Sequence, residues 1–283
     1  MKKILITGKN SYVGTSFLNW MENFPDRYNI NSLSLRNDSW KKDDFFIYDV
    51  VVHVAGLAHI KETKDNVHLY YSVNRDLAYE VAKKAKSEGV KQFIFLSSMS
   101  VYGIKSGIID QTSPLKPKNH YGKSKLEAEN LIMKLEDNSF SVVILRPPMI
   151  YGKGCKGNYK KLAHIARTSP FFPEFNNIRS MIYIDNLSKY VKRIIDNQGR
   201  GLYFPQNNEF VKTSRMVELI AKENGKKIVT TKIFNPILNL FMKHEILGKV
   251  FGSLTYDNAL SKKNNTKFED FVDFEESIRL TEE

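Results

Sequence analysis

The chain has 283 residues, which at ~150 residues per domain corresponds to about two domains, or to one large domain with a smaller lobe. Hydrophobic residues make up 42% and charged residues 26%, values typical of a folded protein, which excludes a disordered or fibrous chain. The net charge is +12, but the lysines are dispersed in pairs with acids between them, so we expect a basic surface and no nucleic-acid partner.

Neither the start of the chain nor any later segment predicts insertion into a membrane. Only three consecutive apolar residues, Ile4–Ile6, follow the first lysines, too few for a signal peptide. No apolar stretch approaches the ~18 to 20 residues needed to cross a bilayer. The single cysteine, Cys155, cannot form an internal disulfide, and the six histidines lack the spacing of metal ligands. We therefore expect a cytoplasmic protein without a metal.

The first half of the chain alternates short β-branched runs with helical patterns. Runs that are apolar on both faces and alternate with helices predict a parallel sheet covered by helices on both sides. The expected strands are 4–7, 30–35, 50–54, 92–97 and 141–146, and the expected helices are 15–22, 73–88 and 121–135. The predicted fold is an α/β, doubly wound (Rossmann) parallel sheet with a smaller C-terminal substrate-binding lobe.

The alternation becomes less regular in the second half of the chain. Residues 152–180 are rich in Gly, Lys, Asn, Phe and Pro and are expected to be irregular, at the rim of a pocket. The later expected elements are helices at 186–197 and 213–224, a mixed lobe to about 253 and a polar, ragged tail. We expect residues 1–152 to form mainly the dinucleotide-binding domain. We expect residues 153–283 to form mainly the substrate-binding lobe, with segments returning to the sheet.

A glycine-containing loop follows the first strand and opens the first helix. Two glycines six residues apart allow a tight turn and close packing of helix on strand, and the free amides at the helix start attract a pyrophosphate. Ser11 stands where the middle glycine of this motif usually lies, so the loop alone is also compatible with a purely structural turn. The loop residues expected to bind a dinucleotide are Gly8, Asn10, Ser11, Tyr12, Val13 and Gly14.

The end of the second strand bears on the choice of cofactor. An acid there accepts hydrogen bonds from the ribose of NAD, whereas a basic residue meets the additional phosphate of NADP. The strand end holds no acid, and Arg36 lies just beyond it. We expect NAD or NADP, with Arg36 favouring NADP. Arg36 could equally be a surface arginine, with Asp38 as the ribose or adenine contact.

Tyr121 and Lys125 begin the third expected helix and lie on one face, one turn apart. A phenol with a pKa of about 10 is a poor base at neutral pH, and a nearby cation favours the phenolate. Tyr121 could then exchange a proton with a sugar hydroxyl or ketone while Lys125 lowers its pKa and holds the nicotinamide ribose. Upstream, the strand at 92–97 ends in a cluster of hydroxyls, including Ser98 and Ser100, that can hydrogen-bond a substrate oxygen.

Together these motifs resemble the extended short-chain dehydrogenase/reductase family, in its NAD-dependent epimerase/dehydratase branch, over nearly the whole chain. The segment 53–56 is similar to the family's segment under the cofactor, and 145–152 to its substrate-side signature. The resemblance implies Ser98 as the catalytic hydroxyl, Tyr121 as the acid/base and Lys125 as its partner. The further cofactor contacts that it implies are Val54, Ala55, Gly56, Asn74 and Pro148.

Two further stretches resemble the family's contacts to a nucleotide diphosphate. Asn158 falls where the family holds the substrate nucleotide, and Arg179 where a guanidinium fork clamps a pyrophosphate. Dehydratases of the family carry an Asp-Glu pair directly after the catalytic hydroxyl, whereas this chain has Met99 and Ser100 there, which disfavours a dehydratase. Ser100 and Ser98 complete the implied substrate contacts. The combination most resembles bacterial polysaccharide-pathway members that act on UDP-hexoses or UDP-N-acetylhexosamines.

We therefore expect an NAD(P)-dependent nucleotide-sugar epimerase or oxidoreductase that transfers hydride at carbon 4 of a UDP-linked sugar. One alternative is an NADPH-dependent 4-keto-sugar reductase without epimerase activity. A second is a catalytically silent, nucleotide-sensing Rossmann protein, which would be expected to lose Ser98, Tyr121 or Lys125. A homodimer could form through the helices expected at 73–88 and 121–135, whose exposed faces are rich in lysine.

Overall fold

The chain folds into two compact units, and each is described by itself. The computed structural model describes residues 1–58, 60–233, 235–236, 248, 251–262 and 269–283. The first unit contains residues 1–103, 114–147 and 187–205, and the second contains 104–113, 148–186 and 206–283. Part of the mixed lobe expected up to residue 253 lies outside the described residues.

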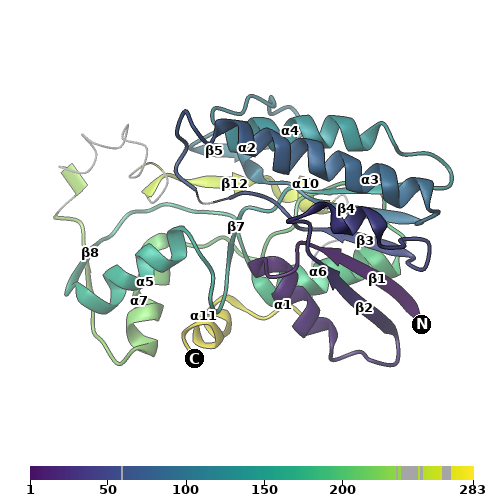
Figure 1. Cartoon of the computed structure of the whole chain (residues 1–283). Coiled ribbons are helices and arrows are strands. Elements are labelled where there is room, and N and C mark those ends of the chain that lie inside the picture. The colour runs from purple at the N-terminus through teal and green to yellow at the C-terminus, as the bar shows by residue number, and fades with distance from the viewer. Residues whose placement is uncertain (59, 234, 237–247, 249–250, 263–268) are drawn as a thin grey trace. The chain divides into compact units, whose positions relative to one another are not determined.

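The first unit is built on a six-stranded sheet in which every neighbouring pair of strands is parallel (Figure 1). The strands in spatial order are β10 (Gly201–Tyr203), β6 (Ser141–Leu145), β4 (Gln92–Leu96), β3 (Val50–His53), β1 (Lys2–Thr7) and β2 (Tyr28–Leu33). β2 lies on one side of β1 and β3 lies on the other, so the strand order reverses at β1. Ligands of open α/β sheets bind at the carboxyl ends of the strands at such a reversal. The predicted doubly wound sheet is confirmed.

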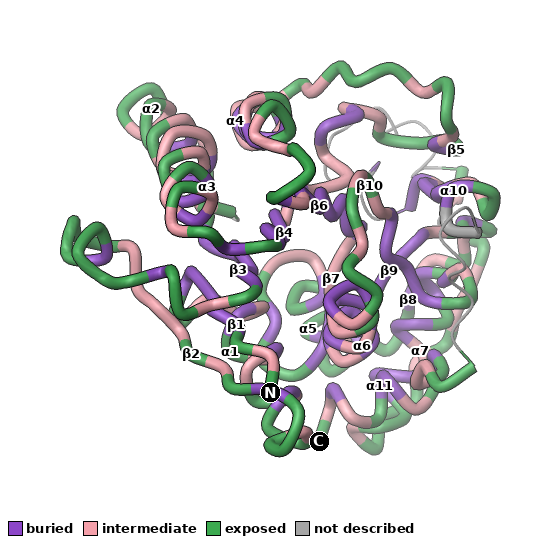
Figure 2. Tube along the Cα trace, turned by 90° about the vertical axis from the view of Figure 1, so that its right-hand side faces the viewer, coloured by how far each residue is buried: buried purple, intermediate pink, exposed green. Residues whose placement is uncertain are grey.

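Helices cover both faces of this sheet, as its apolar strands require. They are α1 (Tyr12–Met21), α3 (Ala78–Ser87), α4 (His120–Met133) and α6 (Ile184–Asp196). Successive strand residues point to opposite faces. Val51 and Phe93 therefore pack in the cluster that α3 and α4 cover, while Val52 and Ile94 face α1 and α6. Figure 2 shows β3 and β4 as buried strands and the outer side of α3 as exposed.

The helix expected at 73–88 is longer and consists of three consecutive segments. They are α2 (Val67–Tyr71), a π-helical segment η2 (Ser72–Leu77) and α3. Interior π turns are rare and often occur at functional sites. Asn74, one of the expected cofactor contacts, lies fully buried in η2.

The connection from β2 to β3 contains no strand and no α-helix. Residues 34–49, all of which the structure describes, form loops around one 3-10 turn, η1 (Asp38–Lys42). Trp40 of this turn is 2% exposed and packs in the core cluster that α3 covers. β2 is therefore an edge strand of the sheet.

The described part of the second unit contains three two-stranded parallel ladders and several helices. The ladders pair β5 (Gly107–Ile109) with β12 (Leu254–Tyr256), β7 (Met149–Tyr151) with β9 (Met181–Tyr183), and β8 (Phe171–Pro173) with β11 (Val229–Thr231). Among its described residues, the helices are α5 (Asn158–Thr168), α7 (Thr213–Glu223), α10 (Asn258–Lys262) and α11 (Phe274–Glu282). Throughout the described ranges, no helix combines the length and the apolar character that crossing a bilayer requires.

Two expectations for this half of the chain were wrong. The region 152–180, expected to be irregular, contains α5 and β8, and the expected ragged tail contains α11. The tail is ordered because Phe274 and Ile278, four residues apart, are buried. The Glu282 carboxylate also accepts hydrogen bonds from Tyr159 and Asn224, both at 2.7 Å.

Candidate active site

The loop between β1 and α1 brings two segments of backbone as close as only glycine allows. Gly8 has a φ of +116°, and a Cβ there would lie 2.7 Å from the backbone nitrogen of Ala55. A Cβ on Gly14 would lie 2.7 Å from the Ser11 Oγ and 3.0 Å from a methyl group of Val54. The absence of a side chain at both positions leaves space beside the backbone at the carboxyl end of β1, where a pyrophosphate could approach the start of α1.

Ser11 explains the departure of this loop from the usual glycine motif. Its Oγ accepts a hydrogen bond from the Gly14 N–H at 3.0 Å and so caps α1. The preceding residue, Asn10, has a φ of 71°, a left-handed conformation that asparagine tolerates better than most residues. Tyr12 and Val13 begin the helix, where backbone N–H groups have no acceptor within the helix and the helix dipole is positive.

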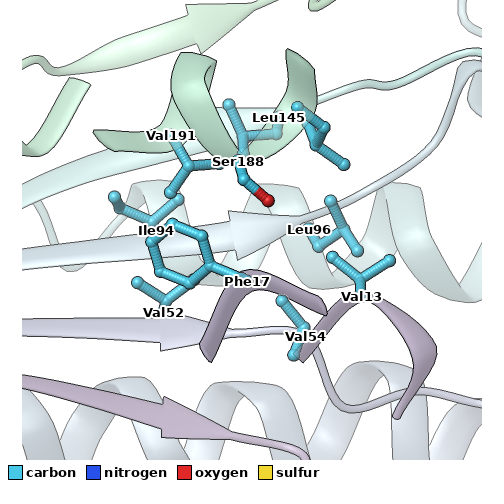
Figure 3. Close-up of a pocket in the computed structure, with 10 residues that line it drawn as sticks. Val13, Phe17, Val52, Val54, Ile94, Leu96, Leu145, Ser188 and Val191 are labelled. Carbon is cyan, nitrogen blue, oxygen red and sulfur yellow. The ribbon is translucent and has the colours of Figure 1, made fainter. Parts of the chain in front are cut away.

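An apolar cavity of about 10 Å³ lies between α1, the sheet and α6 (Figure 3). Figure 3 shows Phe17, Val52 and Ile94 converging on it, with Ser188 carrying the one side-chain oxygen in view. Its volume is roughly that of a single water molecule, so we interpret it as a packing void and not as a ligand site.

Tyr121 and Ser98 meet at the start of α4. Asn119 caps this helix, because its Oδ1 accepts a hydrogen bond from the Gly122 N–H at 2.9 Å. The Ser98 side chain lies close enough to the Tyr121 phenol to affect its pKa. The Ser98 hydroxyl also lies 3.1 Å from the Ser100 Oγ, to which it donates. The two serine hydroxyls are therefore hydrogen-bonded to each other and lie near the phenol.

Burial raises the pKa of the Tyr121 phenol above its usual 10, although the nearby Ser98 side chain acts in the opposite direction. This direction differs from the expected lowering of its pKa by Lys125. Burial also lowers the pKa of the Lys125 amine to about 7, against the opposing effect of Glu129. Near pH 7 a substantial part of the amine is thus uncharged, and its Nζ donates to the Leu96 carbonyl at 2.8 Å.

Lys125 is held in an enclosed position beside the segment that follows β3. Its Nζ lies 4.6 Å from the centroid of the Phe95 ring. A Cβ on Gly56 would lie 3.1 Å from that Nζ and 3.0 Å from the Asn74 Oδ1. Gly56 therefore leaves the space that the lysine side chain and Asn74 occupy.

Asn74 connects the segment after β3 to α4. Its Oδ1 accepts a hydrogen bond from the Leu57 N–H at 2.7 Å, and its Nδ2 donates to the Ser124 Oγ at 3.1 Å. Ser124 in turn donates to the Tyr121 carbonyl at 2.9 Å. These contacts fix the first turn of α4 relative to the expected cofactor segment, 54–56.

Arg36 lies three residues after β2 and is exposed. Across the described residues, its guanidinium forms no hydrogen bond or ion pair. The amides of Gly8 and Lys9 both donate to the Leu33 carbonyl at 3.0 Å, so the end of β2 lies beside the glycine loop. Asp38, the alternative contact, pairs with Lys41 at 3.1 Å.

The remaining expected residues, Pro148, Asn158 and Arg179, belong to the second unit. Asn158 is the first residue of α5 and follows Gly157, which has a φ of 88°. The Arg179 guanidinium donates to the Gly252 carbonyl at 2.5 Å, and burial lowers its pKa. The structure thus brings the glycine loop, Asn74, Ser98, Tyr121 and Lys125 together in the first unit.

Sequence reasoning missed several residues that contact the Tyr/Lys pair. Glu62 accepts a hydrogen bond from the Tyr121 N–H at 3.2 Å. The two residues are 59 positions apart, so no local sequence pattern predicts this contact. Ser124, by contrast, lies between Tyr121 and Lys125 in the motif itself. Glu129 follows Lys125 by four residues, so helical spacing would have placed it on the same face.

A six-stranded doubly wound sheet with a glycine loop at its reversal defines a Rossmann-type nucleotide-binding protein. A model of the NAD dependent epimerase/dehydratase family matches residues 4–202, and the chain belongs to this family. It is accordingly an enzyme of the NAD(P)-dependent epimerase and reductase class. The expected resemblance to extended short-chain dehydrogenases/reductases is confirmed.

Two relatives of known function cover most of the chain. UDP-glucose 4-epimerase of Vibrio cholerae is 29% identical over 307 residues, which span 93% of this chain and 89% of the relative. The N-acetyl-alpha-D-glucosaminyl-diphospho-ditrans,octacis-undecaprenol 4-epimerase of Escherichia coli O157:H7 is 28% identical over 254 residues. These residues span 83% of this chain and 76% of the relative.

Solved structures show the same fold. UDP-glucuronic acid 4-epimerase from Bacillus cereus in complex with NAD has a TM-score of 0.75 at 19% identity and covers 99% of this chain and 97% of its own. The dTDP-4-dehydrorhamnose reductase from Bacillus anthracis in complex with NADP has a TM-score of 0.73 at 19% identity, with coverages of 99% and 98%. At these identities the likeness is one of fold.

Proposed function

We propose that this enzyme oxidises and reduces carbon 4 of a sugar that is linked to a nucleoside diphosphate, as a 4-epimerase. The observation that carries the proposal is the cluster of the Ser98, Ser100 and Tyr121 hydroxyls, in which Ser98 donates to Ser100 and lies near the phenol. It lies in the same unit as the enclosed Lys125 and the glycine loop. Hydroxyls beside a lysine at the start of a helix suit proton exchange with a sugar alcohol or ketone.

Each residue of this group has a distinct part in the proposed reaction. Tyr121 takes the proton of the sugar hydroxyl on oxidation and returns it on reduction. Ser98 donates a hydrogen bond to the same oxygen and steadies the charge that develops on it. Lys125 in its charged form favours the phenolate, and the phosphates of a bound dinucleotide would increase the fraction of charged amine.

The residues of the first unit fit a nicotinamide dinucleotide. The backbone around Gly8 and Gly14 is a cradle that a Cβ would fill, and the start of α1 favours an anion there. Segment 54–56, Asn74 and Lys125 would hold the ribose and nicotinamide side. The cofactor, when bound, supplies a centre that accepts and returns hydride.

The proposed substrate class is a UDP-hexose or UDP-N-acetylhexosamine of cell-surface polysaccharide synthesis. The 29% identical relative is named for UDP-glucose, and the 28% identical relative for a glucosaminyl diphosphate linked to undecaprenol. Both names describe a sugar on a diphosphate. Arg179 would pair with that diphosphate, since a guanidinium matches two phosphate oxygens at once, and Asn158 would contact the nucleotide.

A second candidate function is that of an NADPH-dependent 4-keto-sugar reductase. Arg36 favours it, because its exposed guanidinium has no side-chain partner among the described residues and lies just beyond β2, where it could meet the additional phosphate of NADP. In that case the oxidised sugar comes from another enzyme, and this chain only reduces it.

One experiment separates the two candidates. The purified enzyme is denatured, the released dinucleotide is identified by mass spectrometry, and turnover of UDP-glucose, UDP-N-acetylglucosamine and the polyprenyl-linked sugar is assayed. Stoichiometric NAD with interconversion of 4-epimers supports the epimerase. NADP or an empty site, with NADPH consumption on a 4-keto sugar, supports the reductase.

A paired variant tests the role of Tyr121. In Tyr121→Phe the proton carrier is lost, so we expect kcat to fall about 100-fold or more while dinucleotide binding stays unchanged. Tyr79→Phe, a half-buried tyrosine in α3, serves as the matched control and should keep wild-type kcat. Unchanged turnover in Tyr121→Phe would contradict the assignment, and absence of turnover in the wild-type enzyme would favour a silent nucleotide-binding protein.

A further inference from the structure

Arg146 and Glu129 form a buried ion pair in the first unit. Their side chains are only 8% and 4% exposed. The Arg146 guanidinium donates from Nη2 to the Glu129 Oε2 at 2.6 Å and from Nε to the Oε1 at 3.1 Å. An apolar pair of similar volume is often as stable as a buried ion pair or more stable, because both charges must leave water. Stability alone therefore does not account for this pair.

The ion pair holds both ends of the segment that carries the Ser98 hydroxyl. At one end, the Ser97 hydroxyl donates to the Glu129 Oε1. At the other end, the Arg146 Nη1 donates to the Tyr102 hydroxyl at 2.9 Å, and the guanidinium carbon lies 5.2 Å from the centroid of the Tyr102 ring. Ser98 lies between these two anchors, so its position depends on the pair.

The same carboxylate belongs to the helix that carries the candidate acid/base. Glu129 follows Lys125 by four residues and Tyr121 by eight, so the three side chains lie along one face of α4. The Glu129 charge also raises the pKa of Lys125, against the larger effect of burial. One group thus contacts segment 97–102 and is fixed on the helix of Tyr121.

We propose that Arg146 and Glu129 are positioning residues that set the distance between the Ser98 hydroxyl and the Tyr121 phenol, so that one substrate oxygen meets both. This inference rests on the proposed function, because it concerns proton transfer at Tyr121. In this scheme neither residue touches substrate or cofactor. Loss of the pair therefore lowers turnover more than it weakens binding, as expected when reacting groups are displaced by a fraction of an ångström.

Two kinds of variant test the proposal. The double variant Glu129→Leu with Arg146→Met keeps an apolar, filled interior, and we expect it to fold with kcat lowered at least about tenfold. Ser97→Ala and Tyr102→Phe each remove one link and leave the ion pair, so they remain informative if the double variant does not fold. For each we expect kcat to fall by about three- to tenfold, with the KM for the dinucleotide unchanged within about twofold.

Asp196→Asn provides the matched control. Asp196 also joins a cation and a tyrosine, because it accepts hydrogen bonds from Lys192 at 2.7 Å and from the Tyr28 hydroxyl at 2.5 Å, but it links α6 to β2. We expect this variant to keep wild-type kcat. Wild-type kcat in both single-link variants, or an equal loss in Asp196→Asn, overturns the proposal.

A second measurement does not depend on turnover. Hydrogen exchange detected by mass spectrometry reports how firmly the peptide 97–103 is held, and we expect about tenfold faster exchange there in Ser97→Ala and Tyr102→Phe but not in Asp196→Asn. If the wild-type enzyme turns over no sugar, the proposed function fails, while this exchange still tests the hold on the segment. Unchanged exchange in both single-link variants overturns the positioning role.

Discussion

His53 illustrates how a single buried side chain determines part of the pH response of the fold. It is 0% exposed, its Nδ1 shares a hydrogen bond of 2.8 Å with the Thr7 Oγ1, and its ring stacks against Phe93 and Phe95. Burial, assisted by the charge of Lys125, lowers its pKa from 6.5 to about 3. The folded chain therefore accepts His53 only as a neutral ring.

This environment predicts a loss of stability in acid. As pH falls from 6.5 towards 3, the unfolded chain protonates His53 and the folded chain does not, so the free energy of unfolding decreases over this window. The difference of about 3.5 in pKa corresponds to on the order of 5 kcal/mol. In His53→Asn, the free energy of unfolding should fall less over this pH window, because no histidine at this position is protonated on unfolding. Urea denaturation at successive pH values measures this. His68→Asn, an exposed control, should retain the full decrease; equal curves for both variants would contradict the prediction.

Gly8 permits a second prediction at this scale, with Gly89 as its control. Both have positive φ, +116° and +81°, but a Cβ on Gly8 would lie 2.7 Å from the Ala55 nitrogen, whereas a Cβ on Gly89 has no neighbour within 4 Å. Gly89→Ala should cost about 1 kcal/mol, and Gly8→Ala about 2 to 4 kcal/mol, because only the latter adds a backbone clash. Fluorescence titration with NADH should show at least about tenfold weaker binding for Gly8→Ala alone. Equal affinities of the two variants for NADH would show that the glycine loop does not bind the cofactor.

At the scale of the element, the start of α4 combines a stabilising cap with the candidate acid/base. Asn119 caps α4 by accepting from the Gly122 N–H, and Asp273 caps α11 by accepting from the Glu276 N–H, each at 2.9 Å. Asn119→Ala and Asp273→Ala should each cost about 1 kcal/mol of stability. Only Asn119→Ala should also lower kcat, by several-fold, since Tyr121 lies in the first turn of α4. Thermal melts and steady-state kinetics on both variants test this, and equal kinetics would show that the cap has no part in turnover.

Elements with a strong local pattern could be predicted from the sequence, and elements without one could not. The strands of the sheet are apolar on both faces, so β1, β3 and β4 were predicted nearly at their observed bounds. α11 was not, because two of its buried residues, Ser277 and Thr281, are polar. The Ser277 hydroxyl lies 2.7 Å from the Tyr151 hydroxyl, a contact across 126 residues that no local window contains.

At the scale of the whole molecule, the same distinction applies to the candidate site. The glycine loop and the Tyr121/Lys125 pair are local motifs, and the sequence alone identified them. Their supports are contacts between distant segments: Glu62 is 59 residues from Tyr121, and Asn74 is 50 residues from Ser124. Such pairs depend on the order of strands in the sheet, which residue periodicity does not encode.

The net charge of +12 leads to a prediction about ligand association. A positive molecule attracts polyanions, and salt screens this attraction over about 10 Å at 0.1 M. We expect the association rate of NADP, measured by stopped flow, to fall several-fold between about 20 and 200 mM salt. NAD carries less charge and should show a shallower slope, and Arg36→Gln should reduce the slope for NADP. Identical slopes for the two dinucleotides would argue against a role for Arg36.

The connection between β2 and β3 also affects how separate molecules interact. It holds no strand to cover β2, so the backbone donors and acceptors along one side of that six-residue strand face outward. Such an edge can template the addition of a strand from another molecule, which is how many proteins aggregate. Asn29 and Asn31 are both exposed on β2, and asparagine is a poor strand former. We therefore expect Asn29 and Asn31 to lower the tendency of this edge to pair with a strand of another molecule.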